Sequence, residues 1–175
     1  MDVPLRERRL LERATFGPRP GALAYLREAG AEAWVADQLR RSNPSDGALG
    51  ERLSLFPALA PQPWRRLVGV EMSSDAMGAR PDREARKQLS RRSREISVDV
   101  MGARLVRAVH GRFGLREVML DFWSNHFSVF GRKNQVGALL PHYEREVLQP
   151  HVLGRFEDLL LAVARSPAML VYLDN

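Results

Sequence analysis

The sequence contains no cysteine, so it can form neither disulfide bonds nor thiolate metal sites. No apolar run approaches the roughly 18 residues that a membrane span requires. The first thirty residues hold no uninterrupted apolar stretch of signal-peptide length, so the default expectation is a cytoplasmic protein. The missing thiols leave the redox compartment open.

Several common signatures of catalysis and of β-structure are also absent. The chain has no glycine-rich phosphate loop, no HExxH zinc motif and no GxSxG nucleophile elbow. It also lacks a convincing alternation of apolar and polar residues, the pattern that indicates half-buried strands. Helical periodicity dominates instead. The sequence therefore predicts an all-α fold, a multi-helix orthogonal or antiparallel bundle with no significant sheet.

The charge is positive and concentrated in one segment. The whole chain carries +6, while residues 80–94 hold seven arginines or lysines against two acidic residues, or +5. The rest of the chain is therefore nearly neutral. This segment contains no aromatic side chain that could stack on a base, which weakens a nucleic-acid hypothesis. We expect an exposed, solvated segment, and keep nucleic-acid binding through 80–94 as a remote alternative.

The organisation that we expect has three parts: N-terminal helices over 1–79, the basic segment over 80–94, and core helices over 95–175. The first part should hold three helices: one over about 4–15, one that begins at Pro20 and ends before Gly30, and one over 32–40. FGPRPG, residues 16–21, should separate the first two. The composition of SNPSDGALG, residues 42–50, predicts a loop, and two short helical pieces should follow it.

Apolar stripes at helical spacing mark the core helices of the third part. One stripe holds Val98, Met101, Leu105 and Val109. The next runs from Leu115 through Phe122 to His126, which lies eleven residues after Leu115 and on the same stripe. This spacing predicts that His126 is buried. Further stripes begin at Val136 and at Phe156. The side chains that we expect to have a structural role are Phe122, Trp123, Phe127, Tyr143 and Phe156.

The end of the chain combines a clear helix start with an unusual apolar content. Ser166 and Pro167 are typical of an N-cap and a first helical position. The helix that they open is apolar on almost every face through residues 168–173 and therefore needs cover on most of them. We expect that cover to come from a further part of the same fold or from a partner protein.

The candidates for chemistry are histidines and polar neighbours. The catalytic candidates are His126, His151 and Asn125, and the weak metal-ligand candidates are His126, His151 and Asp174. A buried imidazole without a partner loses on the order of 1–3 kcal/mol, so each histidine implies a specific partner or a structural role. His142 and Glu146, four residues apart, are more typical of a surface pair than of a metal site.

Three segments resemble a known bacterial family, domain of unknown function 1800. They are FWSNHFSVF (122–130), the segment YEREVLQPHVLGRFEDLLLAVARSPAMLVYLDN (143–175), and the opening RLLERATFGPRPGALAYLREAGAEAWVADQL (9–39). The specific motifs are FWxNHF at 122–127 and PHxLGxF at 150–156. The resemblance implies a helical protein usually well over twice this length, which continues past Asn175 with an Asn-Glu-Asn-Tyr-like run. It also implies members that are often exported.

Two classes of function follow. One is a helical binding or accessory module with no complete active site in this chain, in which both histidines are structural and no cofactor is needed. The other is part of a metal-assisted hydrolase, in which His126 and His151 hold a divalent metal together with residues beyond Asn175. We favour the binding module, because these 175 residues do not contain a complete set of catalytic residues.

Overall fold

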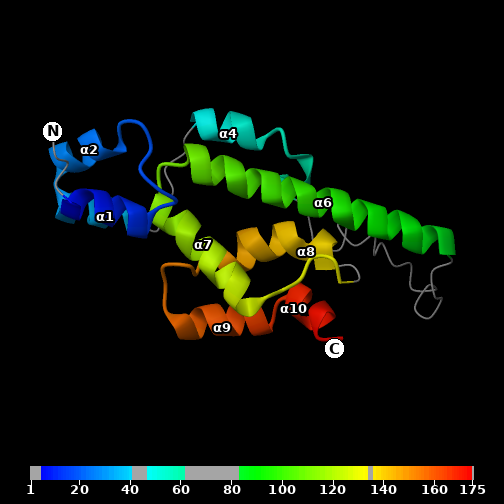
Figure 1. The fold of residues 1–175 in the computed structure, drawn as a ribbon. Helices are drawn as coiled ribbons and strands as arrows, with labels where there is room; N and C mark the ends of the chain where they lie inside the picture. Colours follow the sequence, from blue (N-terminus) through cyan, green and yellow to red (C-terminus); the bar gives the residue numbers. More distant parts are fainter. Residues whose placement is uncertain (1–4, 41–46, 62–82, 134–135, 175) are drawn as a thin grey trace.

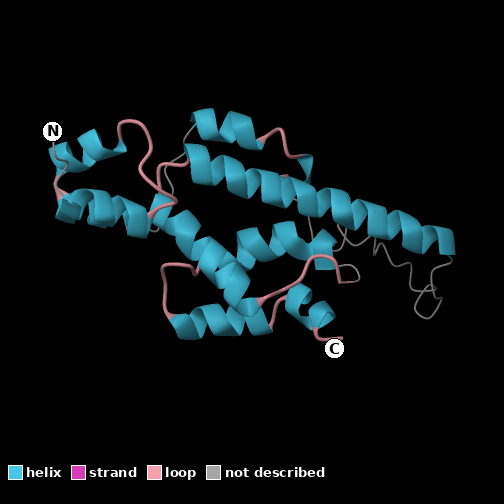
Figure 2. Ribbon diagram, in the orientation of Figure 1, coloured by secondary structure: helices cyan, strands magenta, loops and turns pink. Residues whose placement is uncertain are grey.

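The structure is a computed structural model that describes residues 5–40, 47–61, 83–133 and 136–174. All regular structure in these ranges is helical, and no strand is present in them (Figure 2). The fold class predicted from the sequence is confirmed. The elements, in chain order, are α1 (Leu5–Ala14), α2 (Ala22–Ala29), α3 (Ala31–Gln38), α4 (Gly47–Leu53), η1 (Pro57–Leu59), α6 (Arg83–His110), α7 (Gly114–Phe127), α8 (Val136–His142), η3 (Tyr143–Leu148), α9 (Phe156–Ala164) and α10 (Pro167–Tyr172).

Helices α1 to α3 form a small cluster at one end of the molecule (Figure 1). Leu11, Leu26 and Trp34 meet there as a buried apolar core of their own. The FGPRPG segment ends α1 as expected. Gly17 and Gly21 both have positive φ, which side chains with a Cβ rarely adopt. Two glycines in one short segment therefore permit the sharp return from α1 to α2.

Residues 42–50 differ in part from the loop expected from their composition. The structure begins α4 at Gly47, while residues 42–46 lie outside the described part of the chain. Leu49 is buried where α4 packs along α6. Burial of this leucine offsets the low helix propensity of the neighbouring glycines.

The long helix α6 is the backbone of the fold and crosses the boundary expected at residues 94 and 95. It runs without interruption from Arg83 to His110, with α4 along one side and α7 and α8 packed below it in Figure 1. Residues 80–82 lie outside the described part. In the basic segment, Ser93 is buried and Leu89 is partly covered. The exposed charged side chains are Arg83, Glu84, Lys87, Arg91, Arg92 and Arg94.

The buried face of α6 is not the one that its largest apolar residues predict. Val98, Met101, Leu105 and Val109 face solvent, with 51 to 69% of each residue exposed. The opposite face is the buried one, and its members recur at alternating spacings of three and four residues. They are Ser93, Ile96, Val100, Ala103 and Arg107. Both faces satisfy helical periodicity, so periodicity alone selected the wrong one.

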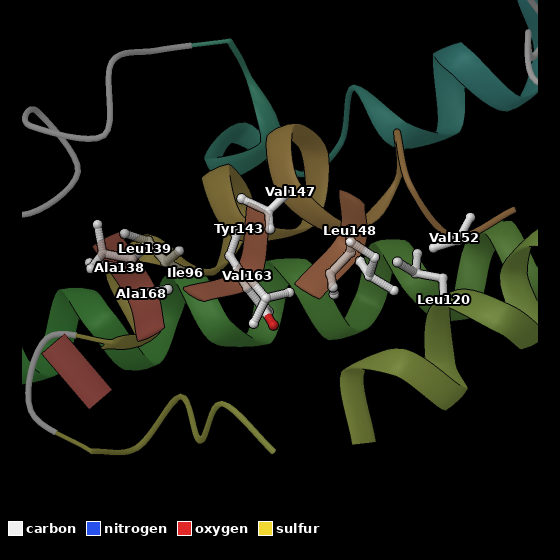
Figure 3. Close-up of a cluster of buried hydrophobic side chains, with 11 residues drawn as sticks. Ile96, Leu120, Ala138, Leu139, Tyr143, Val147, Leu148, Val152, Val163 and Ala168 are labelled. Atoms are coloured by element: carbon white, nitrogen blue, oxygen red, sulfur yellow. The ribbon is translucent and has the colours of Figure 1, made fainter. Parts of the chain in front are cut away.

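The main core lies where α8 and η3 cross α6 and α7. Leu139, Tyr143 and Leu148 are almost completely buried in it. Figure 3 shows the core side chains in a row, with Leu139 beside Ala138 and Leu148 toward Leu120. Pro141 stands inside α8, and the helix widens into the π-helical turn η3 directly afterwards. Because proline has no backbone N–H, α8 lacks one helical hydrogen bond at Pro141. π-Helical turns such as η3 are frequent beside functional sites.

The C-terminal helix α10 begins as the sequence predicts. Ser166 is its N-cap, since its Oγ accepts a hydrogen bond from the Met169 backbone N–H at 3.2 Å. α10 packs on α8 and α9 and buries Ala168, while Leu170 and Leu173 stay exposed. Cover for residues 168–173 by a further segment or a partner stays a prediction.

Candidate functional site

The histidine of the FWxNHF motif is exposed, contrary to the burial that the helical spacing predicts. His126 stands in the last turn of α7, where its ring stacks against Phe122 at a centroid distance of 5.9 Å. It also meets the rings of Trp123 and Phe127 edge to face. Leu120 is the fully buried residue of α7, so the inward face is rotated away from His126. The predicted stripe is therefore only partly right: Met119 and Trp123 pack against the main core, whereas Phe122 and His126 are exposed.

The two sequence motifs meet through their aromatic rings. Trp123 stacks on Phe156 at 5.6 Å and on Phe127 at 5.9 Å, and its edge contacts Phe122 at 4.9 Å. FWxNHF and PHxLGxF are therefore parts of one packed unit between α7 and α9. Tyr143 lies in the main core, against which Trp123 and Phe127 pack, and burial raises the pKa of its phenol.

His151 occupies a different environment. It is partly buried, and its Nδ1 lies 2.8 Å from the carbonyl oxygen of Val147. A carbonyl can only accept, so Nδ1 carries the proton in the neutral ring and Nε2 keeps its lone pair. His151 lines a shallow hollow beside α9 together with Arg155, Asp158 and Arg165. His126 does not line this hollow.

The structure does not gather the metal-ligand candidates. His126 contacts aromatic rings, His151 faces the hollow, and the Asp174 carboxylate pairs with the Lys133 ammonium at 2.7 Å. Within the described ranges, no three His, Asp or Glu side chains lie close enough together to hold an ion. No helix in these ranges is long and apolar enough to cross a membrane.

A buried ion-pair network joins α6, α7 and η3, and sequence reasoning missed it. Arg107 pairs with Glu117 at 3.0 Å and also with Glu144, which in turn pairs with Arg104. Burial raises the pKa of Glu117 against the opposing effect of Arg107. Burial lowers the pKa of Arg107, but its two carboxylate partners raise it by more than burial lowers it. The net change in its pKa is therefore upward.

A sequence signal for this network does exist. Arg107 is four residues from Ala103 and seven from Val100, and thus continues the buried face of α6. Glu144 follows the buried Tyr143 and precedes the buried Val147 by three residues. Charged residues of opposite sign on the buried faces of two helices predict a buried ion pair, once the buried face of each helix is correctly identified.

A large groove opens between the N-terminal cluster, α6 and α7. One wall is the FGPRPG segment with Phe16 and Pro18, and the other is the exposed side of α6 with Met101, Leu105 and Val109. Asp121 and Asn125 of α7 also line it, joined by a hydrogen bond of 3.2 Å from the Asn125 amide to the Asp121 carboxylate. The catalytic candidate Asn125 is thus placed in the groove, while His151 lines the separate hollow.

Comparison with known families gives one match that covers nearly the whole chain. Residues 9–175 match the model of the family described as "Protein of unknown function (DUF1800)". The chain belongs to this family. No curated protein and no solved structure matches it at a significant level. The resemblance seen in the sequence motifs is confirmed, and the packed unit of Trp123 and Phe156 joins two motifs of this DUF1800 chain.

Proposed function

We propose that this chain is a helix-binding module, and that the groove beside α6 receives an amphipathic helix of another polypeptide. The observation that carries the proposal is the apolar stripe of α6, defined as Val98, Met101, Leu105 and Val109, which is more than half exposed at every position. Soluble proteins seldom expose large contiguous apolar patches unless they bind something there.

The spacing of the stripe favours a helical ligand. Its members follow one another at three, four and four residues, and Ala108 lies three residues after Leu105. Alternation of three and four residues is the pattern by which one helix packs along another. A helix that binds in this way inserts side chains at i, i+3, i+4 and i+7 into the facing surface.

The size of the groove agrees with a polypeptide ligand. Its volume is about 1410 Å³, whereas small-molecule pockets measure roughly 300–1,000 Å³. Its lining is mixed: Leu105 and Phe16 are apolar, while Asp121, Asn125 and Arg104 add polar groups. Protein–protein interfaces likewise combine apolar and polar residues.

A titration with a model ligand tests the proposal. The probe is a labelled 21-residue amphipathic helical peptide with leucine at its a and d positions and glutamine at its flanking positions. We expect saturable binding by fluorescence anisotropy, weakened at least about tenfold by Leu105→Glu, since the variant buries a charge in the interface. The control is Leu160→Glu on α9, another exposed leucine away from the stripe.

Equal weakening by both substitutions, or no saturable binding by the parent protein, would contradict the proposal. Far-ultraviolet circular dichroism of each variant verifies that the helices remain folded.

A metal-assisted hydrolase is the second candidate, supported by one observation. The Nδ1 of His151 donates to a backbone carbonyl, which leaves Nε2 available, as in many metal-binding histidines. Asp158 lines the same hollow, but further ligands would have to complete the site. The test is calorimetric titration with zinc: micromolar binding that His151→Ala abolishes supports a metal site, and unchanged binding in that variant contradicts it.

A further inference from the structure

The basic side chains of α6 continue the apolar stripe along the same face of the helix. Lys87, Arg91 and Arg94 precede Val98 at intervals of four, three and four residues, the spacing that keeps side chains on one side of an α-helix. All three are exposed. The buried residues Ser93, Ile96 and Val100 lie on the opposite side. One face of α6 is therefore basic in its first half and apolar in its second.

The charges of this basic half are poorly compensated by the described residues. Residues 83–95 contain six arginines or lysines and two glutamates, a net charge of +4. Arg91 pairs with Glu95 at 3.0 Å, but both side chains are largely exposed, so the pair neutralises little. Lys87 and Arg94 form no ion pair with any residue that the structure describes. The N-terminal half of α6 extends beyond α8 and α10 in Figure 1.

We infer that the helix received by the apolar stripe is acidic at one end, and that its carboxylates lie against Lys87, Arg91 and Arg94. This inference rests on the proposed function and adds the charge of the partner. A ligand helix long enough to cover Val98 to Val109 and to continue along α6 necessarily reaches these three cations. A partner with carboxylates at those positions completes the face, and one with basic residues there is repelled.

Other occupants fit this face less well. A second copy of the chain in parallel orientation would set one basic half against the other. An antiparallel copy would set the basic half against the end of the stripe, where His110 and Arg112 add no negative charge. A nucleic acid would use the cations, but residues 83–95 contain no aromatic side chain for base stacking and the apolar stripe gives a phosphate backbone no partner.

The experiment compares three labelled peptides with the same apolar a and d positions. Over the turns that reach residues 87–94, their flanking positions carry glutamate, glutamine or lysine. We expect the glutamate peptide to bind about tenfold more tightly than the glutamine peptide at low salt, with the lysine peptide weakest. The difference should shrink strongly at 0.5 M salt, because exposed charge pairs are screened at about that ionic strength.

The decisive protein variant is the triple charge reversal Lys87→Glu, Arg91→Glu, Arg94→Glu. It should reverse the order of the glutamate and lysine peptides and leave the glutamine peptide within about twofold. The matched control is Arg6→Glu, Arg9→Glu, Arg13→Glu on α1, which changes the same net charge at three exposed positions of one helix. The control should leave the order of the three peptides unchanged.

The outcomes separate this inference from the proposed function. If all three peptides bind equally and Leu105→Glu weakens each, the module binds helices but the inferred acidic partner is wrong. If the control reverses the order as fully as the α6 variant does, only net charge matters, and the inference is again overturned. If a 20-nucleotide single strand displaces the glutamate peptide at lower concentration than polyglutamate of equal charge, the basic half serves nucleic acid instead.

Discussion

The two long faces of α6 reverse the usual arrangement, in which apolar side chains face inward and polar side chains face solvent. The inward face holds a serine, an alanine and an arginine among its five buried members, whereas the outward face holds valine, methionine and leucine. The inward arginine, Arg107, is tolerated because Glu117 and Glu144 surround it. The outward apolar stripe has no such explanation within the described chain. The inward face therefore serves the fold, and the outward face is the one to which the proposed function assigns binding.

The largest expected effect comes from breaking the ion-pair network on the inward side. Glu144→Ala leaves Arg107 buried with one partner instead of two and removes the carboxylate partner of Arg104. Removing one partner of a buried ion pair costs about 3–5 kcal/mol. Because Arg107 keeps Glu117, the free energy of unfolding should fall by less than this, about 2–4 kcal/mol, in urea titrations. The control is Glu146→Ala, two residues away on η3 and exposed, which should change it by less than about 0.5 kcal/mol.

A pair of valine truncations on α6 tests the two faces against each other. Val100 is almost completely buried and Val98 is mostly exposed, although they are two residues apart. Val100→Ala should lower the free energy of unfolding by roughly 1–3 kcal/mol through lost burial and a residual cavity. Val98→Ala should change it by less than about 0.5 kcal/mol. Equal costs in urea titrations would show that the assignment of the faces is wrong.

A smaller, pH-dependent effect is expected at His142, a half-buried histidine at the end of α8. Burial lowers the pKa of His142, while Glu146 opposes this shift and Arg145 adds to it. The unfolded chain therefore binds this proton more readily. The stability associated with neutral His142 is present above the unfolded pKa of about 6.5 and is lost as the pH falls through the lower folded value.

The measurement is the urea midpoint at several pH values from about 7.5 downward through 6.5. His142→Gln should flatten the decline of the midpoint in this window, since glutamine does not titrate. His110→Gln, an exposed histidine at the end of α6, should leave the decline in place. A parent protein whose midpoint rises on acidification through this window would contradict the assigned direction.

The sequence predicts the helices of this chain better than it predicts their rotation. The breaks at FGPRPG and the start at Ser166 follow from local backbone chemistry, and both agree with the structure. The rotation of α6 and α7 depends on partners distant in sequence. Glu144 draws Arg107 inward, and Gly102 allows Phe56 to lie closely against α6, since a Cβ there would approach its ring to 2.5 Å.

The candidate site was harder to predict for the same reason. The helical spacing of Leu115, Phe122 and His126 predicts a buried histidine, but Leu120 is the residue that α7 buries. The groove joins FGPRPG to α6 across some eighty residues of sequence, a proximity that no local pattern contains. The family resemblance identifies the motifs, but it does not predict which face of each helix that carries them is buried.

Introduced cysteines test the central claim most directly, because the natural sequence contains none and each new thiol is therefore unique. The measurement is the alkylation rate of single variants along α6, with and without a saturating amount of the glutamate-flanked peptide. Met101→Cys and Leu105→Cys should react rapidly alone and at least about tenfold more slowly with the peptide, whereas Val100→Cys and Ala103→Cys should react slowly in both conditions. Rates that show no helical periodicity, or outward positions that the peptide leaves unprotected, would contradict a docking face on α6.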